Sequence, residues 1–293
     1  MATDYRTTQA LLAGDAEFRA FVQAIDSGLL AAGGVVAASD TGQIDPATVA
    51  KPGAINTDAG FRMYRFNDAA QATQPVFIKL IFGIGASINL PRITFQMGTV
   101  TNGAGVFTGT RTTAAVVYPL GSVPVAGQIR HYHSSGGDGR ISHVTHDPDI
   151  SGRGLAFAVE RLRLLDGTPS DRAIFACAMA ATTSRAHYLI TNAAYYATAI
   201  LSDNGATFPV PAGPIAIAGL GVDVLILPMI AQVSPYFQSM LSFLFTQGGF
   251  GAGVPIAVNH MGAERQYMAF NGNSIGTQNA GVGVNTQVLM AWE

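Results

Sequence analysis

The chain has 293 residues, of which 48% are hydrophobic and only 12% are charged. That length supplies one large all-β domain or two smaller domains, and the hydrophobic content argues against a disordered chain. The formal net charge of −2 gives no general electrostatic attraction to nucleic acid. A charge content about half that of average soluble domains fits a surface covered by neighbouring subunits, and it fits a neutral β-protein equally well.

No targeting or membrane segment is expected. The first six residues carry an early acid and lead to no apolar segment of the signal-peptide kind, which predicts synthesis in a cytoplasm. The most apolar run, 212–231, is interrupted by Pro214, Asp223 and Pro228, so buried strands explain it better than membrane insertion. Cys177 has no second cysteine to pair with, and we expect it to pack as a small hydrophobe.

The first predicted element is an amphipathic helix over residues 15–31. Its apolar residues recur at spacings of three and four: Phe18, Phe21, Val22, Ile25 and Leu29. Asp15 offers an N-cap or first-turn acid, and Gly28 and Gly33 offer stop signals. A lone helix must dock on something. The helix either covers its own sheet or docks onto a neighbouring subunit.

We divide the chain into two parts. Residues 1–59 are expected to form the N-terminal helix and an extended arm, and residues 60–293 a β-sandwich domain.

From residue 60 onward the chain predicts a succession of strands. They are expected at 61–66, 76–82, 93–97, 105–108, 114–118, 154–163, 173–182, 186–191, 223–227, 254–259, 265–270 and 285–292. Asn102-Gly103 predicts a tight turn, and residues 236–245 fit a helix and a strand equally. This spacing favours an all-β fold, an antiparallel sandwich or jelly roll with one N-terminal helix, over βαβ units.

The segment 134–154 is rich in Ser, Gly, Asp and Pro. It is either a long surface loop or a boundary between two β units, and we favour a long loop inserted in one β domain. Four of the six histidines lie in or beside it: His131, His133, His143 and His146. With Asp147 and Asp149 they offer nitrogen and oxygen ligands for a metal. No His-Glu-x-x-His motif is present and the loop would have to order around an ion, so we favour loop histidines that bind no metal.

Other chemical motifs give little support for an enzyme. Gly83-Ile-Gly85 lacks the third glycine of a dinucleotide motif, and Gly248–Gly253 has no following Lys-Ser/Thr. No Gly-x-Ser-x-Gly elbow occurs. Among the carboxylates, Glu160 lies on a predicted strand beside Arg161 and Arg163, and no glycosidase pair is indicated. We therefore expect no catalytic residues, cofactor or metal. The arginines at 62, 65, 161 and 163 are interpreted as contacts to carboxylates or carbonyls.

The most informative stretch is 60–85, which predicts two strands joined by a polar connector. It carries Tyr64-Arg65-Phe66-Asn67-Asp68, then Gln71-Ala72-Thr73, then Pro75-Val76-Phe77-Ile78-Lys79. This pattern resembles one found in structural proteins of tailed bacteriophage particles. The segment 41–44 and the C-terminal strand extend the resemblance, which runs loosely from about residue 15 to the end.

The resemblance implies a non-enzymatic structural subunit on the neck, collar, tail or baseplate side of a virion. Its partners would be copies of itself and other virion proteins, and the protein would be made in the host cytoplasm. One alternative is a receptor- or glycan-binding fibre or decoration protein, for which exposed aromatics such as Tyr195 and Tyr196 would be needed. Another is a metal-dependent enzyme that uses the cluster from His131 to His146.

Overall fold

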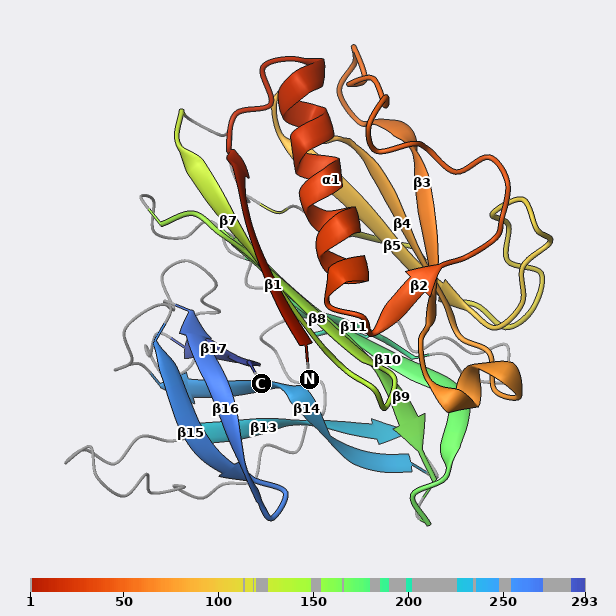
Figure 1. Ribbon diagram of the computed structural model, residues 1–293, viewed down its shortest axis with the longest axis vertical. Coiled ribbons are helices and arrows are strands. Elements are labelled where there is room, and N and C mark those ends of the chain that lie inside the picture. The colour runs from red at the N-terminus through yellow and green to blue at the C-terminus, as the bar shows by residue number, and fades with distance from the viewer. Residues whose placement is uncertain are drawn as a thin grey trace.

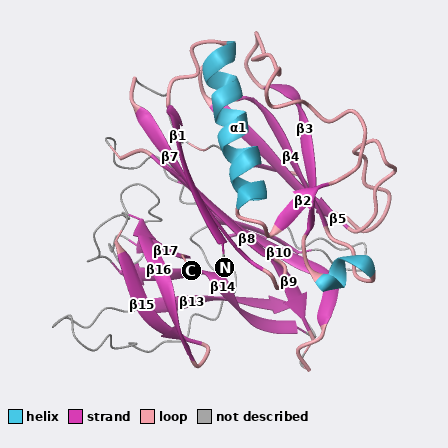
Figure 2. Ribbon diagram, viewed as in Figure 1, coloured by secondary structure: helices cyan, strands magenta, loops and turns pink. Residues whose placement is uncertain are grey.

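Three antiparallel sheets and one α-helix make up the described part of the protein in a computed structural model (Figures 1 and 2). The structure describes residues 2–112, 114–117, 119, 126–148, 154–164, 166–179, 185–189, 199–201, 226–233, 236–247, 254–270 and 286–292. The sequence-based expectation of an all-β, sandwich-like fold with an N-terminal helix is confirmed.

The largest sheet, called the central sheet, has the strand order β1-β7-β8-β9-β10-β11-β12. Its strands are β1 (Ala2–Gln9), β7 (Gln128–Gly136), β8 (Arg140–His146), β9 (Gly154–Arg163), β10 (Pro169–Met179), β11 (Arg185–Leu189) and β12 (Ala199–Leu201). The N-terminal strand is therefore an edge strand, held to a partner more than 100 positions away in the sequence.

The second sheet, called the motif sheet, has the order β2-β3-β4-β5-β6. Its strands are β2 (Val35–Ala37), β3 (Thr57–Phe66), β4 (Phe77–Ile84), β5 (Pro91–Gly98) and β6 (Ala115–Val117), with the short 3-10 helix η1 (Ala69–Ala72) between β3 and β4. It packs on the central sheet through aromatic contacts. The Phe95 ring on β5 stacks on Phe175 of β10 with centroids 3.7 Å apart, and it also meets Phe157 of β9.

The C-terminal sheet has the order β13-β14-β17-β16-β15 and covers the opposite face of the central sheet. Its strands are β13 (Ile226–Val233), β14 (Tyr236–Gln247), β15 (Pro255–His260), β16 (Ala263–Phe270) and β17 (Thr286–Ala291). The central strands β8 and β9 are consequently buried on both faces, and every residue of β8 is buried. A strand covered on both sides has no need of the apolar–polar alternation that marks a half-exposed strand.

Helix α1 (Asp15–Ala31) begins and ends where the sequence predicts. The N-cap is Gly14 rather than Asp15, and the Glu17 carboxylate accepts a hydrogen bond from the Gly14 amide at 2.9 Å. The helix lies between the central and motif sheets, beside β1, β7 and β2 (Figure 1). Its apolar side chains belong to the same core cluster as Ile78 and Phe157. The helix covers its own sheets, as one of the two sequence interpretations proposed.

The predicted division at residue 59 does not follow the packing. Residues 2–9 form a strand of the central sheet, and α1 contributes Phe18 and Phe21 to a core cluster that also contains side chains of the motif sheet and the central sheet. Residues 1–59 therefore do not form an extended arm.

The predicted long loop at 134–154 is wrong over most of its length. β7 and β8 form a hairpin with a tight turn at 137–139, where Gly139 has φ +83°. Close packing accounts for Ser135, one of the small residues that suggested a loop. A Cβ on Gly34 would lie 2.5 Å from the Cβ of Ser135, and the Ser135 hydroxyl donates to the Ala32 carbonyl at the end of α1.

Most of the other predicted strands are confirmed, β9 over its full predicted length. The segment at 236–245, left open from sequence, is the strand β14. The predicted strand at 105–108 is reduced to a single bridge between Phe107 and Thr101, around the turn that contains Gly103 with φ +79°. Among the described strands, those that the sequence analysis missed are β1, β2, β7, β8 and β12.

Candidate functional site

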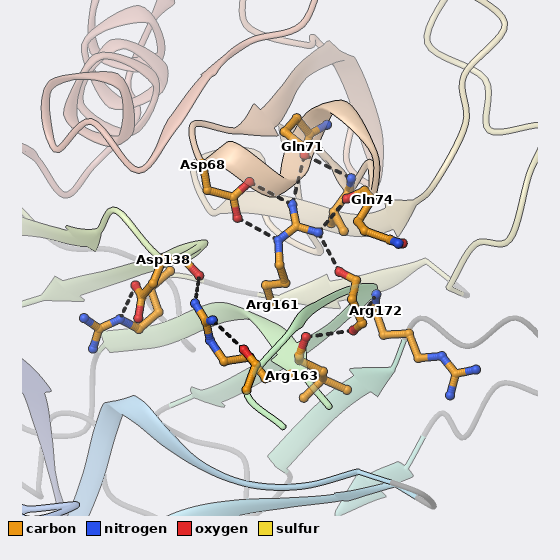
Figure 3. A network of polar contacts seen from close by, with 12 residues as sticks. Asp68, Gln71, Gln74, Asp138, Arg161, Arg163 and Arg172 are labelled. Atoms are coloured by element: carbon orange, nitrogen blue, oxygen red, sulfur yellow. Dashed lines mark hydrogen bonds and ion pairs between the residues drawn. The ribbon is translucent and has the colours of Figure 1, made fainter. Parts of the chain in front are cut away.

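A buried polar network joins the central sheet to the connector of the resemblance motif (Figure 3). The Arg161 side chain on β9 is fully buried, and its guanidinium donates to both carboxylate oxygens of Asp68, at 2.7 Å and 3.0 Å. It also donates to the carbonyls of Gln74 and Ser170 at 2.5 Å and 2.6 Å, and to the Gln71 side chain at 3.2 Å. A bidentate arginine with added carbonyl acceptors is the arrangement that makes a buried charge tolerable.

The network gives a physical role to two of the motif residues. Asp68 is the N-cap position of η1, and Gln71 lies within it, so the short helix presents both side chains to Arg161. Gln71 also accepts a hydrogen bond from the Val76 amide at 3.1 Å, which fixes the entry to β4. Gly139, in the turn of the β7–β8 hairpin, leaves the space that Asp68 fills, because a Cβ there would lie 2.5 Å from the Asp68 carboxylate.

A second buried charge, Glu160, joins the central sheet to the C-terminal sheet. Its carboxylate accepts hydrogen bonds from the backbone amides of Leu241 at 3.1 Å and Ser242 at 2.5 Å, both on β14. Burial raises the pKa of Glu160, while the Arg140 charge and the Ser242 bonds oppose that rise. Neighbouring residues on β9, Glu160 and Arg161, thus point to opposite faces and bind opposite layers.

Three of the four histidines form a stacked cluster inside the protein, beneath α1. The ring centroids of His133 and His143 are 4.6 Å apart, and those of His131 and His143 are 5.8 Å apart. Hydrogen bonds join His131 to Thr8 on β1 at 2.9 Å and His143 to Thr145 at 2.7 Å. All three rings are fully inaccessible to solvent, so they are not the loop histidines that the sequence suggested.

The cluster is a poor environment for positive charge. Burial lowers the pKa of His131 to about 3. Burial also lowers the pKa of His133 and His143 well below the usual value, and the neighbouring imidazoles add to the effect. Within the described part of the chain, neither ring nitrogen of His133 has a hydrogen-bond partner, and the Asp4 carboxylate oxygen is 3.7 Å from Nδ1. An unperturbed imidazole gains charge between about pH 7 and 5, so burial moves the charging of these three rings in the folded protein to lower pH.

The histidines do not converge on a common point. Across the residues that the structure describes, no set of three or more His, Cys, Asp or Glu side chains is arranged to hold a metal ion. His146 lies apart from the other three, with its ring 6.2 Å from Phe270 of the C-terminal sheet. Asp147 is buried at the end of the hairpin, and Asp149 lies outside the described residues.

An aromatic contact brings the two ends of the chain to the same strand. Tyr132 on β7 has its ring 4.9 Å from Tyr5 of β1, 4.9 Å from Phe270 and 5.8 Å from Trp292. Tyr132 and Phe270 are buried, but Tyr5 is 49% exposed at the outer edge of the central sheet. Sequence analysis did not single out this group, because the β1 strand that supplies Tyr5 was not predicted.

The remaining predicted residues serve separate contacts. Arg62 donates to Asp26 of α1 at 2.7 Å, whereas Arg65 is exposed and Arg163 binds backbone carbonyls in the adjoining turns. Gly83 lies where a Cβ would be 2.4 Å from the Thr57 carbonyl, which agrees with close backbone packing rather than nucleotide binding. Gly248–Gly253, Tyr195 and Tyr196 lie outside the described residues, as does the Cys177 side chain.

Comparison with known proteins gives no relative: the chain matches no family model, no curated protein and no solved structure. The α-helix present in the described part of the chain is not of the length and hydropathy that a membrane crossing requires.

Proposed function

We propose that the protein is a non-enzymatic structural subunit of a tailed bacteriophage particle, on the neck, collar, tail or baseplate side. Its partners are copies of itself and other virion proteins. The observation that carries the proposal is the binding of Asp68 and Gln71 to the buried Arg161. These two residues belong to the pattern that resembles one in phage structural proteins, and here both bind Arg161 in a buried brace between layers.

The environment of the other buried ionisable groups also favours a structural role. Glu160 is held by backbone amides of the neighbouring sheet, and the histidine cluster is sealed beneath α1 and β1. Catalytic acids and bases need access to a substrate as well as a perturbed pKa. These groups have perturbed pKa values but no access to a substrate. They therefore fit a role in the packing of layers better than a role in chemistry on a bound molecule.

The test is to locate the chain in particles. Phage particles produced in the host and purified by density gradient are analysed by quantitative mass spectrometry, and by electron microscopy with gold-labelled antibody against this chain. We expect a fixed, stoichiometric copy number and label on the neck, collar, tail or baseplate. The protein found in infected cells but missing from purified particles would contradict the proposal.

Two other outcomes would select the alternatives. Label at fibre tips or over the capsid surface, with binding of the purified protein to host cells, would favour a receptor-binding fibre or a decoration protein. Stoichiometric transition metal in the purified protein that is lost when His131, His133, His143 and His146 are replaced would favour the metal-dependent enzyme.

A further inference from the structure

The edge of the central sheet is formed by β1, which pairs with β7 and has no other described strand on its outer side. Its side chains alternate in exposure. Thr3, Tyr5 and Thr7 are exposed, while Asp4 and Arg6 are partly buried on the side of α1. An edge strand offers a row of backbone donors and acceptors to another chain unless something covers it.

The register shows which residues face outward. The Ala10 amide donates to the Gly127 carbonyl at 2.9 Å, and the pairing continues without a bulge from Gln9–Gln128 to Ala2–Ser135. In an antiparallel ladder hydrogen-bonded and non-hydrogen-bonded pairs alternate. The even-numbered residues of β1 therefore bond to β7, and the odd-numbered residues Thr3, Tyr5 and Thr7 direct their amide and carbonyl groups outward.

The sequence of this edge is self-complementary. Thr3-Asp4-Tyr5-Arg6-Thr7, aligned antiparallel with a second copy of itself about Tyr5, sets Thr3 opposite Thr7 and Tyr5 opposite Tyr5. The same alignment sets Asp4 of each copy opposite Arg6 of the other. Each of the two pairs thus joins a negative and a positive side chain. The residues that would exchange backbone hydrogen bonds are Thr3, Tyr5 and Thr7, whose amide and carbonyl groups face outward.

We propose that two copies of the chain pair through β1 about a twofold axis at Tyr5, which joins their central sheets into one continuous sheet. This inference rests on the self-association included in the proposed function and names the interface for it. A twofold contact uses the same patch on both subunits, so the patch must complement itself. A strand whose charges, hydroxyls and outward backbone groups all match its own reverse meets that requirement.

The side-chain environments on the two faces fit the pairing. On the face away from α1, Tyr5 already packs on Tyr132, and the second copy's Tyr5 would extend this aromatic row across the axis. On the helix side, Arg6 is held against Asp4 of its own strand at 2.7 Å and reaches the Ser27 carbonyl of α1 at 3.5 Å. These contacts hold the two charges beside the edge before a partner arrives.

Charge reversal gives a test with internal rescue. Asp4→Arg alone places two positive charges opposite each other across the axis, and Arg6→Asp alone places two negative charges there. We expect each variant alone to dimerise at least about tenfold more weakly than the unmodified chain in sedimentation equilibrium. An equimolar mixture of the two variants restores opposite charges at both pairs, so it should form a heterodimer, and the double variant should recover the homodimer.

The controls separate this effect from a change in net charge or in folding. Glu264→Arg and Arg65→Asp make the same charge changes at exposed positions on β16 and β3, and they should leave the dimer unchanged. Thermal melting of each variant shows that it is folded. A folded single variant that dimerises as well as the unmodified chain would overturn the proposed interface.

Disulfide trapping reports the register without any change of charge. In a chain with Cys177→Ala, Tyr5→Cys places two thiols on a hydrogen-bonded pair, where Cα atoms about 5.5 Å apart suit a disulfide. It should form a covalent dimer on mild oxidation, whereas Thr3→Cys should do so only when mixed with Thr7→Cys. Equal trapping at positions 3 and 5 in homodimers, or a monomer at every concentration, would overturn the inference.

The interface and the proposed function can fail separately. A protein found in particles whose association ignores the β1 charges would exclude the interface and leave the virion role standing. A β1-dependent dimer that is missing from particles would do the reverse.

Discussion

Arg161 and Asp68 lie 93 positions apart in the sequence, yet their side chains meet as a bidentate ion pair with the arginine fully buried. The pair joins β9 of the central sheet to the connector that precedes β4 of the motif sheet (Figure 3). Because Asp68 supplies a counter-charge through both of its carboxylate oxygens, the brace depends on both members.

We predict that Asp68→Asn lowers the free energy of unfolding by about 3 kcal/mol, because it removes that counter-charge from a buried guanidinium. Urea denaturation followed by circular dichroism measures this change. The control is Glu264→Gln, which neutralises an exposed carboxylate on β16 and should change stability by less than about 0.5 kcal/mol. Equal effects of the two substitutions would show that the pair contributes little.

Acid should destabilise the protein through the histidine cluster. The folded pKa values of His131, His133 and His143 are lowered, chiefly by burial, so below about pH 6.5 the unfolded chain binds protons that the folded chain does not. The stability contributed by the neutral rings is complete above about pH 6.5 and is lost as pH falls toward the folded values. Urea denaturation at a series of pH values between about 7.5 and 4 should show this decline.

His133→Phe isolates one ring of the cluster. The substitution keeps an aromatic ring in contact with α1 and removes two buried nitrogens for which the described residues offer no hydrogen-bond partner. We expect stability at about pH 7.5 to change by less than about 1.5 kcal/mol, and the dependence on pH below about 6.5 to become shallower. An unchanged pH dependence would mean that His133 does not contribute to acid sensitivity.

Gly28 in α1 provides a steric test of how closely the helix lies on the cluster. An added Cβ would lie 2.2 Å from the His133 ring, so Gly28→Ala should cost about 1–3 kcal/mol, although alanine normally favours a helix. In a chain that already carries His133→Ala, the Gly28→Ala substitution should cost less stability, since the clash is removed. Gly53→Ala, where a Cβ meets no atom within 4 Å, serves as the matched control.

Removal of residues 1–33 should abolish the cooperative melting transition. The deletion takes away β1 and α1, and with them Phe18 and Phe21, both fully buried in the main core. The exposed faces of the two remaining sheets would then lack a cover. A truncated protein that still melts cooperatively would show that the sheets form a stable core without the helix.

The sequence was sufficient where a local pattern matched its surroundings. α1 has one apolar face against the sheets, so its periodicity and bounds were readable, and strands such as β9 were marked by continuous runs of apolar residues. The interpretation of Arg161 as a contact to carboxylates or carbonyls was also correct. That Asp68 and Gln71 are its partners could not be predicted, because no local signal links residues so distant in the chain.

The errors at β7 and β8 have a physical cause. Serine and glycine are usually residues of loops, but here Ser135 lets the end of α1 and Gly34 approach the sheet, and Gly136 leaves room for the Arg140 and Asp138 side chains. Histidine is intermediate in how often it is buried, and the Ser- and Gly-rich neighbours pointed to a surface loop, yet the cluster is fully buried beneath α1 and beside β1. The missed strand β1 lacks an apolar run altogether, because within the described structure no other layer covers its outer face and outer edge.

The long sequence separation between β1 and its partner strand has a consequence for synthesis. β1 pairs with residues 128–135, which are translated more than 100 residues later, and the aromatic contacts between the main sheets need Phe175. Helix α1 can meet the motif sheet earlier, but the part of its apolar face that packs against the central sheet stays uncovered until β7 has been translated. A nascent chain with such delayed long-range pairing folds slowly and is exposed to aggregation. Chaperones that shield short apolar helices on emerging chains should therefore raise the yield of this protein more than those that act after release.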